Sequence, residues 1–213
     1  MLRRTMLVCA FFCLAAQAVI IDRIAIVVGN HIVKDSDIER DIRITSFLNN
    51  EQPDFSLPSR KKAASRLIDQ QIIRDEVESG EYSVAPASEA SAMVAQIKKK
   101  RYPTAVRYRQ ALAHYGIDDA ELKSALMWQT TVLRFIDSRF RPGVLVTDAD
   151  IQSYYTAHQA ELKREHPGAA DANAMRPDIE DIIAGERVNQ QFYSWLDEQR
   201  KQVRVEYREE SLQ

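Results

Sequence analysis

The pattern of apolar and polar positions begins with two short apolar runs, residues 21–28 and 31–33, separated by a Gly-Asn pair. Runs rich in β-branched residues on either side of such a pair predict a β-hairpin with a tight turn. Ser36 and Glu39 follow with the spacing of a capping box, in which both side chains satisfy free backbone N–H groups. We therefore expect a helix that begins at Ser36 and runs to about Asn49.

Apolar residues then recur at helical spacing through most of the chain. Residues 51–58 hold two prolines and are expected to form a loop. Asp118 and Glu121 have the spacing of a second capping box, and Thr147 is expected to cap a later helix. The predicted helices cover residues 59–78, 86–100, 104–115, 119–140, 147–162 and 177–202.

The chain closes with alternating polar and apolar residues from Arg204 to Tyr207, which predicts a short strand. We expect this strand to join the N-terminal hairpin as a third strand. The fold class is therefore mainly α, a helical domain with a small β element formed by the hairpin and the C-terminal strand. Residues 165–176, with a Pro-Gly pair and a run of Ala, Asn and Asp, are the clear linker.

Residues 1–18 have the three parts of a secretory signal peptide. Two arginines precede an apolar run over residues 6–16, and the Ala-Gln-Ala sequence ending at Ala18 is a cleavage signal. A membrane anchor is the alternative, but the run is shorter than the roughly 20 residues of a spanning helix. A lipoprotein is disfavoured because Cys9 and Cys13 lie inside the run. We expect cleavage after about Ala18, export, and no stable membrane anchor.

Cleavage would change the composition of the chain in two ways. Residues 19–213 contain no cysteine, so neither a disulfide nor a thiolate metal site is expected there. They carry 27 basic residues against 31 acidic ones, a net charge of −4. This mild acidity disfavours nucleic acid as a partner, because proteins that bind phosphate backbones usually present a basic patch. The length suits one large domain or two small ones, and we expect a single domain over residues 19–213.

Residues with catalytic or metal-binding potential do not form a recognisable group. The four histidines, at 31, 114, 158 and 166, lack the spacing of a metal site, and the sequence contains neither a nucleophile elbow nor a phosphate-binding loop. The acid pairs lie at predicted helix starts, where they cap backbone N–H groups. The four cations of residues 98–101 lie at a predicted helix C-terminus; contact with an acidic partner or anionic lipid is the alternative to dipole compensation. We expect no catalytic residue, metal or cofactor, and therefore no enzyme.

Aromatic residues are the more informative set. Most of them belong in the core of a helical domain of this size. Three groups of rings nevertheless exceed what one buried face needs, and adjacent rings on a helix point about 100° apart. We take six of them as candidate peptide-binding residues: Tyr102, Tyr108, Tyr115, Tyr154, Tyr155 and Trp195. The sequence leaves open which of these rings are exposed.

The order of segments resembles SurA-type periplasmic chaperones. Residues 21–33 are similar to the opening of that family, and residues 107–117 to its helix with an Ala-Leu-Ala sequence and a glycine stop. Residues 144–155 resemble its Val-Thr-Asp cap and Tyr pair, and residues 192–207 its last helix and returning strand. The resemblance covers nearly all of residues 19–213. It implies one chaperone core, made of residues 19–164, the linker 165–176 and a C-terminal helix and strand within 177–213.

The chain departs from the family at one place. SurA-type proteins usually carry parvulin prolyl-isomerase domains before the last helix, and the short linker 165–176 occupies that position here. The resemblance therefore implies a periplasmic holdase that binds unfolded outer-membrane or secreted proteins, without isomerase activity. Two alternatives remain open. One is a prolyl isomerase by family association, and the other is a dedicated assembly or structural partner of one envelope complex.

Overall fold

The computed structural model of the chain describes residues 22–165, 171 and 173–212. The predicted signal peptide over residues 1–18 and half of the predicted linker over residues 165–176 lie outside these residues. The described chain is mostly helical with one small antiparallel sheet, which confirms the predicted fold class.

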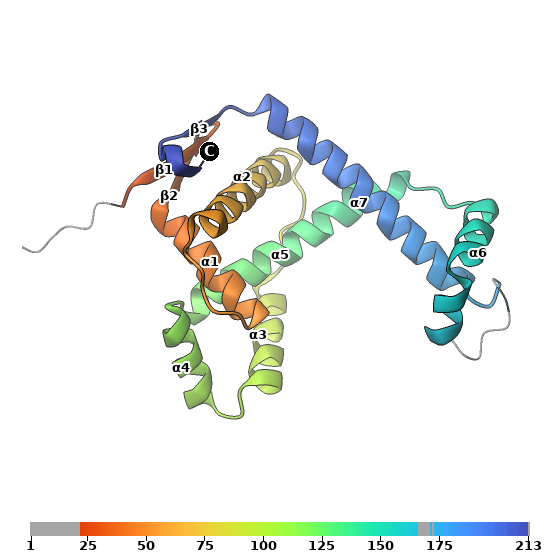
Figure 1. Cartoon of the computed structure of the whole chain (residues 1–213), viewed down its shortest axis with the longest axis horizontal. Coiled ribbons are helices and arrows are strands. Elements are labelled where there is room, and N and C mark those ends of the chain that lie inside the picture. Colours follow the sequence, from red (N-terminus) through yellow and green to blue (C-terminus); the bar gives the residue numbers. More distant parts are fainter. Residues whose placement is uncertain (1–21, 166–170, 172, 213) are drawn as a thin grey trace, which may run out of the picture.

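The sheet joins the two ends of the described chain (Figure 1). Strands β1 (Ile24–Val28) and β2 (His31–Lys34) form the predicted hairpin, and Gly29 takes a φ of +57° in its turn, which glycine adopts without steric cost. Strand β3 (Val205–Tyr207) pairs antiparallel with the other edge of β1, so the strand order is β2-β1-β3. The expected third strand is confirmed.

Helices α1 to α5 form the body of the molecule together with this sheet and the second half of the last long helix (Figure 1). The chain runs from the sheet into α1, returns along α2, and then forms a hairpin of two helices before the long α5. Their bounds are α1 Asp35–Asn49, α2 Leu57–Ser79, α3 Ala87–Arg101, α4 Ala105–Tyr115 and α5 Asp119–Phe140.

The start of α1 differs from the prediction. Ser36 is not its cap: the Ser36 backbone N–H and hydroxyl both donate to the carboxylate of Asp22, at 3.2 and 2.6 Å. The helix begins one residue earlier, and the Lys34 backbone N–H donates to Asp37 at 3.0 Å. Strand β2 thus runs directly into α1, because the Asp22 carboxylate accepts from the Ser36 N–H and the Arg23 carbonyl accepts from the Asp35 N–H at the helix start.

The other two predicted caps are confirmed. Asp118 accepts from the Glu121 backbone N–H at 2.7 Å, and Glu121 accepts in return from the Asp118 N–H at 2.9 Å. At the later helix, the Thr147 hydroxyl accepts from the Asp150 N–H at 3.2 Å, while Asp150 accepts from the Thr147 N–H at 2.8 Å. Both are reciprocal capping boxes.

Two clusters of buried residues hold the body together. The larger one lies where the sheet, α1, α2 and α5 meet the second half of α7 (Arg176–Gln202), and it includes Ile26, Ile38 and Phe135. The smaller one lies between α1, α3, α4 and the first half of α5, around Phe47 and Leu122. Helix α5 belongs to both clusters and so fixes the α3–α4 hairpin to the rest of the body.

A third cluster lies apart from the body. After the short helix η1 (Arg141–Gly143), α6 (Asp148–Glu165) packs on the first half of α7, and the buried residues of this cluster are Ile151, Tyr155, Leu162, Met175, Ile179 and Ile183. Figure 1 shows α7 extending from the sheet to α6, which lies at the far end from the sheet. We call α6 with the first half of α7 the arm.

Candidate binding cleft

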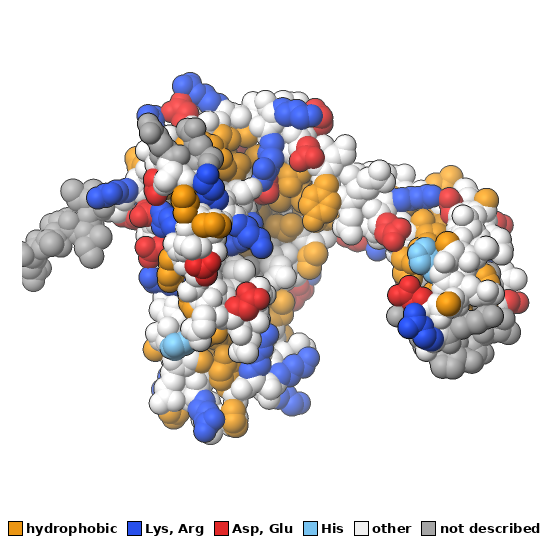
Figure 2. All heavy atoms as spheres, viewed as in Figure 1, with side chains coloured by type: hydrophobic (Ala, Val, Ile, Leu, Met, Phe, Trp, Pro, Cys, Tyr) orange, Lys and Arg blue, Asp and Glu red, His pale blue; other side chains and the backbone are white. Residues whose placement is uncertain are grey.

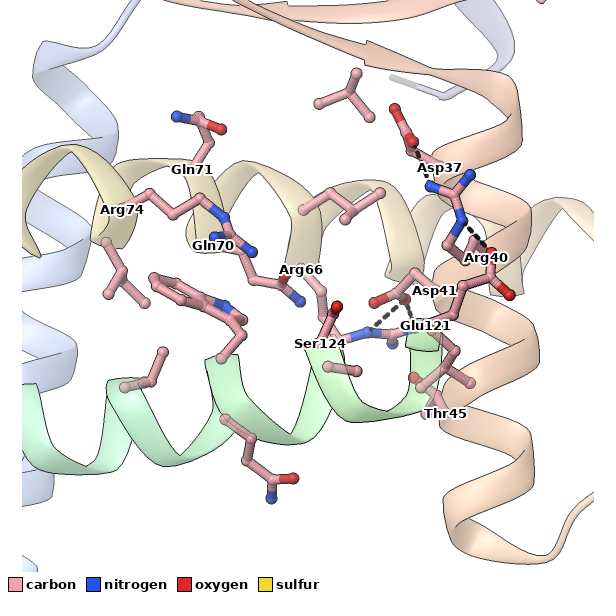
Figure 3. Close-up of a pocket in the computed structure, with 18 of the residues that line it drawn as sticks. Asp37, Arg40, Asp41, Thr45, Arg66, Gln70, Gln71, Arg74, Glu121 and Ser124 are labelled. Carbon is pink, nitrogen blue, oxygen red and sulfur yellow. Dashed lines mark hydrogen bonds and ion pairs between the residues drawn. The ribbon is translucent and has the colours of Figure 1, made fainter. Parts of the chain in front are cut away.

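An open cleft of about 1010 Å³ lies between α1, α2 and α5 (Figure 3). Helices α2 and α5 form its two long walls, α1 crosses one end, and β2 contributes two residues beside α1. The apolar lining residues are Ile32, Val33, Ile44, Leu48, Leu67, Ile73, Ala120, Ala125, Trp128, Val132 and Leu133. The polar ones are Asp37, Arg40, Asp41, Thr45, Arg66, Gln70, Gln71, Arg74, Glu121, Ser124 and Gln129.

The apolar floor comes mainly from one face of α5. Ala125, Trp128 and Val132 recur at helical spacing and therefore lie on the same side of that helix. Leu133 and Ile32 also line the cleft, and they remain 61% and 54% exposed. Exposed apolar side chains inside a concave surface favour contact with apolar groups of another molecule.

Ion pairs organise the end of the cleft at α1 (Figure 3). Arg40 donates to Glu121 of α5 at 2.8 Å and to Asp37 of its own helix at 2.8 Å, so it links α1 to α5. Arg66 of α2 donates through Nε to Asp41 of α1 at 3.0 Å, and its Nη2 contacts the same carboxylate. These pairs fix the relative positions of the three helices that form the cleft.

Burial changes the proton affinity of two of these groups. It raises the pKa of Asp41 above its ordinary value, and the hydrogen bonds and charge of Arg66 only partly offset this. Burial also disfavours the charge of Arg40, but its hydrogen bonds to Glu121 and Asp37 outweigh that effect and raise its pKa. The arginine therefore stays charged, which keeps the α1–α5 link intact.

Arg74 is the third arginine of the cleft, and its environment differs. Its guanidinium lies over the ring of Trp128, with Cζ 3.8 Å from the ring centroid. Among the described residues no carboxylate or carbonyl accepts a hydrogen bond from it, and burial lowers its pKa. The Trp128 Nε1 is the one buried side-chain nitrogen or oxygen of the described chain that has no hydrogen-bond partner.

Three of the six predicted aromatic residues meet at the α3–α4 end of the body. Tyr102 stacks on Phe47 with ring centroids 6.1 Å apart, and Tyr115 contacts the same ring edge-on at 5.4 Å. Tyr108 is buried, contacts Tyr102, and donates its hydroxyl to Asp119 at 2.8 Å. Tyr102 and Tyr108 also line a smaller pocket of about 550 Å³ beside α4.

The other three lie elsewhere. Tyr155 is buried in the arm and Tyr154 packs half-buried beside it, while Trp195 contacts Phe135 and Phe140 in the core of the body. The six residues therefore belong to three separate clusters, and none of them lines the cleft. Their role as peptide contacts stays a prediction.

The residues that form the cleft were not singled out from the sequence. One sequence feature of the cleft is visible in α2, where Arg66, Gln70 and Arg74 recur every four residues and so form a polar row on one face. A polar row of this kind is also typical of a solvated helix face, so the spacing alone does not indicate a cleft. The opposing wall comes from α5, far away in the sequence.

No helix in the described part of the chain is both long and apolar enough to cross a membrane. The described residues also contain no group of three or more His, Cys, Asp or Glu side chains placed to hold a metal ion. A comparison with protein-family models and with curated proteins finds no match to this chain.

Proposed function

We propose that residues 19–213 form a periplasmic holdase chaperone, which binds apolar segments of unfolded exported proteins, including outer-membrane proteins, without isomerase activity. The cleft between α1, α2 and α5 carries this proposal. Its floor offers Trp128, Val132 and Leu133 to apolar side chains, and its rim offers charged groups held in place by ion pairs. Apolar burial is not directional, so such a surface binds many sequences weakly without a nucleotide.

The arrangement of elements supports the resemblance to SurA-type chaperones. The opening hairpin and the closing strand share one sheet, and the Thr147-capped helix carries the Tyr pair as the resemblance implies. Figure 2 shows hydrophobic side chains exposed among charged ones over the body and at the α6 end of the arm. Mixed apolar and charged surfaces keep a chaperone soluble while it contacts apolar clients.

Suppression of aggregation tests the proposal. An outer-membrane barrel protein, unfolded in denaturant, is diluted into buffer with and without residues 19–213, and light scattering is followed. We expect scattering to fall at near-equal molar ratios. The variant Leu133→Glu, which places a charge on the cleft floor, should lose most of this effect. Unchanged scattering with several client proteins would contradict the proposal.

A matched variant distinguishes client binding in the cleft from client binding to any exposed apolar residue. Leu145 is 75% exposed, even more than Leu133, and does not line the cleft. Leu145→Glu should therefore keep full activity, whereas Leu133→Glu should not. Equal losses in both variants would indicate that client proteins bind to dispersed apolar residues.

A dedicated envelope partner is the second candidate, and the exposed surface of α7 favours it. Ile182 and Tyr193 are both exposed and are eleven positions apart on α7, so they lie about 20° apart around the helix axis. Two exposed apolar residues on one face suit a fixed helix-packing partner. A pull-down dominated by one protein at fixed stoichiometry, lost in Tyr193→Glu, would support this candidate over a holdase with many clients.

A further inference from the structure

Arg74 forms no ion pair among the described residues, unlike the other two cleft arginines, and Glu78, one turn further along α2, acts on it by charge alone. Arg40 forms ion pairs with both Asp37 and Glu121, and Arg66 forms one with Asp41. The three positive and three negative charges of the cleft thus sum to zero, but they are distributed unevenly. Among these lining residues, the α1 end has one excess negative charge and the other end has the positive charge of Arg74, which Glu78 outside the lining offsets without contact. A ligand that complements the cleft therefore carries its negative charge towards Arg74.

The stacking of Arg74 leaves its hydrogen-bonding groups available. A guanidinium that lies over an aromatic ring uses its face, while its five N–H donors remain in its plane. None of these donors has an acceptor among the described residues, although the side chain is half-buried. The Trp128 N–H beneath it is unpaired as well. A carboxylate offers two acceptor oxygens in the geometry that a guanidinium binds best.

The row that contains Arg74 indicates the form of the ligand. Figure 3 shows Arg66, Gln70 and Arg74 projecting from α2 into the space beside α5. Residues four apart on a helix are separated by about 6 Å along its axis. Alternate residues of an extended strand are separated by about 6.6 Å, so such a strand running along α2 would face this row with every second side chain. Its remaining side chains would face the apolar floor on α5.

From these observations we propose that Arg74 is a specificity-determining residue, which binds the carboxylate of a glutamate or aspartate in an extended segment of client polypeptide. The acidic residue lies among the polar positions of the segment, and its apolar neighbours contact Trp128 and Val132. This proposal rests on the proposed function, because it takes the cleft as the client site. It adds a chemical preference that apolar burial alone does not supply.

Fluorescence of Trp128 measures the preference directly. The sequence holds two tryptophans, so Trp195→Phe leaves Trp128 as the single reporter. Two acetylated and amidated peptides of alternating apolar and polar residues, identical except for a central glutamate or glutamine, are titrated into residues 19–213 carrying this substitution. We expect the glutamate peptide to bind about tenfold more tightly, as a charge-assisted hydrogen-bonded pair allows.

Variants of Arg74 test whether this residue causes the preference for the glutamate peptide. Arg74→Met keeps an apolar stem on Trp128 and should bring the two affinities within about twofold of each other. Arg74→Glu should reverse the preference, so that a peptide with a central lysine binds better than the glutamate peptide. Arg107→Met removes an exposed cation of α4, outside the cleft, and should keep the preference for glutamate. Thermal melting of each variant establishes that it is folded.

Any other outcome of these peptide titrations contradicts the proposal. Equal affinity for both peptides before Arg74 is changed, or a preference for glutamate that remains in Arg74→Met, would show that Arg74 does not recognise a carboxylate. The proposed holdase function would be unaffected by this result. If neither peptide binds although aggregation is still suppressed, the client site lies outside the cleft. If neither peptide binds and aggregation continues, the proposed function fails as well.

Discussion

Asp119 is the carboxylate that ties three helices together at the α3–α4 end of the body. It accepts from the Tyr108 hydroxyl at 2.8 Å and is paired with Lys98 and Lys123, both at 3.0 Å. Burial opposes its charge, but hydrogen bonds from Lys123, Lys98 and Tyr108 outweigh that effect and lower its pKa to about 2. Burial, together with the hydrogen bond that the Tyr108 hydroxyl donates to Asp119, raises the pKa of Tyr108.

The lowered pKa of Asp119 predicts a loss of stability in acid. A carboxylate whose pKa falls on folding stabilises the native state above its unfolded value of 3.8, and this contribution disappears as the pH falls towards about 2. Asp119→Asn should therefore be less stable than the parent at neutral pH and lose less stability over this acid range. Melting temperatures of both proteins across that pH range measure the difference. Parallel curves would contradict the assignment.

A buried hydroxyl provides a second residue-scale prediction. Thr131 is fully buried; its hydroxyl accepts from the Ala85 backbone N–H at 3.0 Å and donates to the Met127 carbonyl at 2.9 Å. Thr131→Val keeps the shape but leaves the Ala85 N–H without a partner, which should lower the free energy of unfolding by about 1–3 kcal/mol. Urea denaturation measures this loss.

The neighbouring threonine is the control for this variant. The Thr130 hydroxyl donates to the Leu126 carbonyl at 3.0 Å and accepts from no backbone N–H among the described residues. Thr130→Val therefore leaves no buried donor unpaired and should cost clearly less than Thr131→Val. Equal losses would show that the Ala85 contact contributes little.

At the scale of elements, the closing strand and the opening hairpin depend on each other. The Gly29 N–H donates to the Arg204 carbonyl at 2.8 Å, the Arg208 N–H donates to the Ala25 carbonyl at 2.8 Å, and Leu212 is buried in the main cluster. Deleting residues 204–213 should therefore lower the melting temperature and speed hydrogen exchange in β1. Amides of α6 serve as the internal control. An unchanged melting temperature would contradict this dependence.

The elements themselves could be predicted because their signals are local. A Gly-Asn pair between β-branched runs indicates a hairpin, and the Asp118 and Thr147 capping boxes indicate helix starts. The start of α1 could not be predicted in this way. Its Ser36 N–H donates to Asp22 and its Asp35 N–H to the Arg23 carbonyl, and both acceptors lie at or before the start of the hairpin and reach α1 only after the hairpin has folded.

At the scale of the whole molecule, the cleft depends on contacts between distant segments. Its walls come from α1, α2 and α5, and the Arg40–Glu121 pair that joins two of them spans residues 81 positions apart. The sequence pattern shows that Tyr102, Tyr155 and Trp195 are large rings on helices, but not which cluster each one joins. Selecting aromatic residues by density therefore selected rings from three separate clusters, whose role as peptide contacts stays a prediction, and did not select Trp128 or Arg74 of the cleft.

The central claim, that the cleft is the client site, is tested most directly by site-specific crosslinking. Residues 19–213 contain no cysteine, so one engineered cysteine can carry a photocrosslinker without competition. Gln129 is exposed in the cleft, whereas Gln110 is exposed on α4 outside it. We predict that the crosslinker on Gln129→Cys captures an unfolded outer-membrane barrel protein and that the one on Gln110→Cys does not. Equal capture from both positions, or capture from Gln110→Cys alone, would contradict the claim.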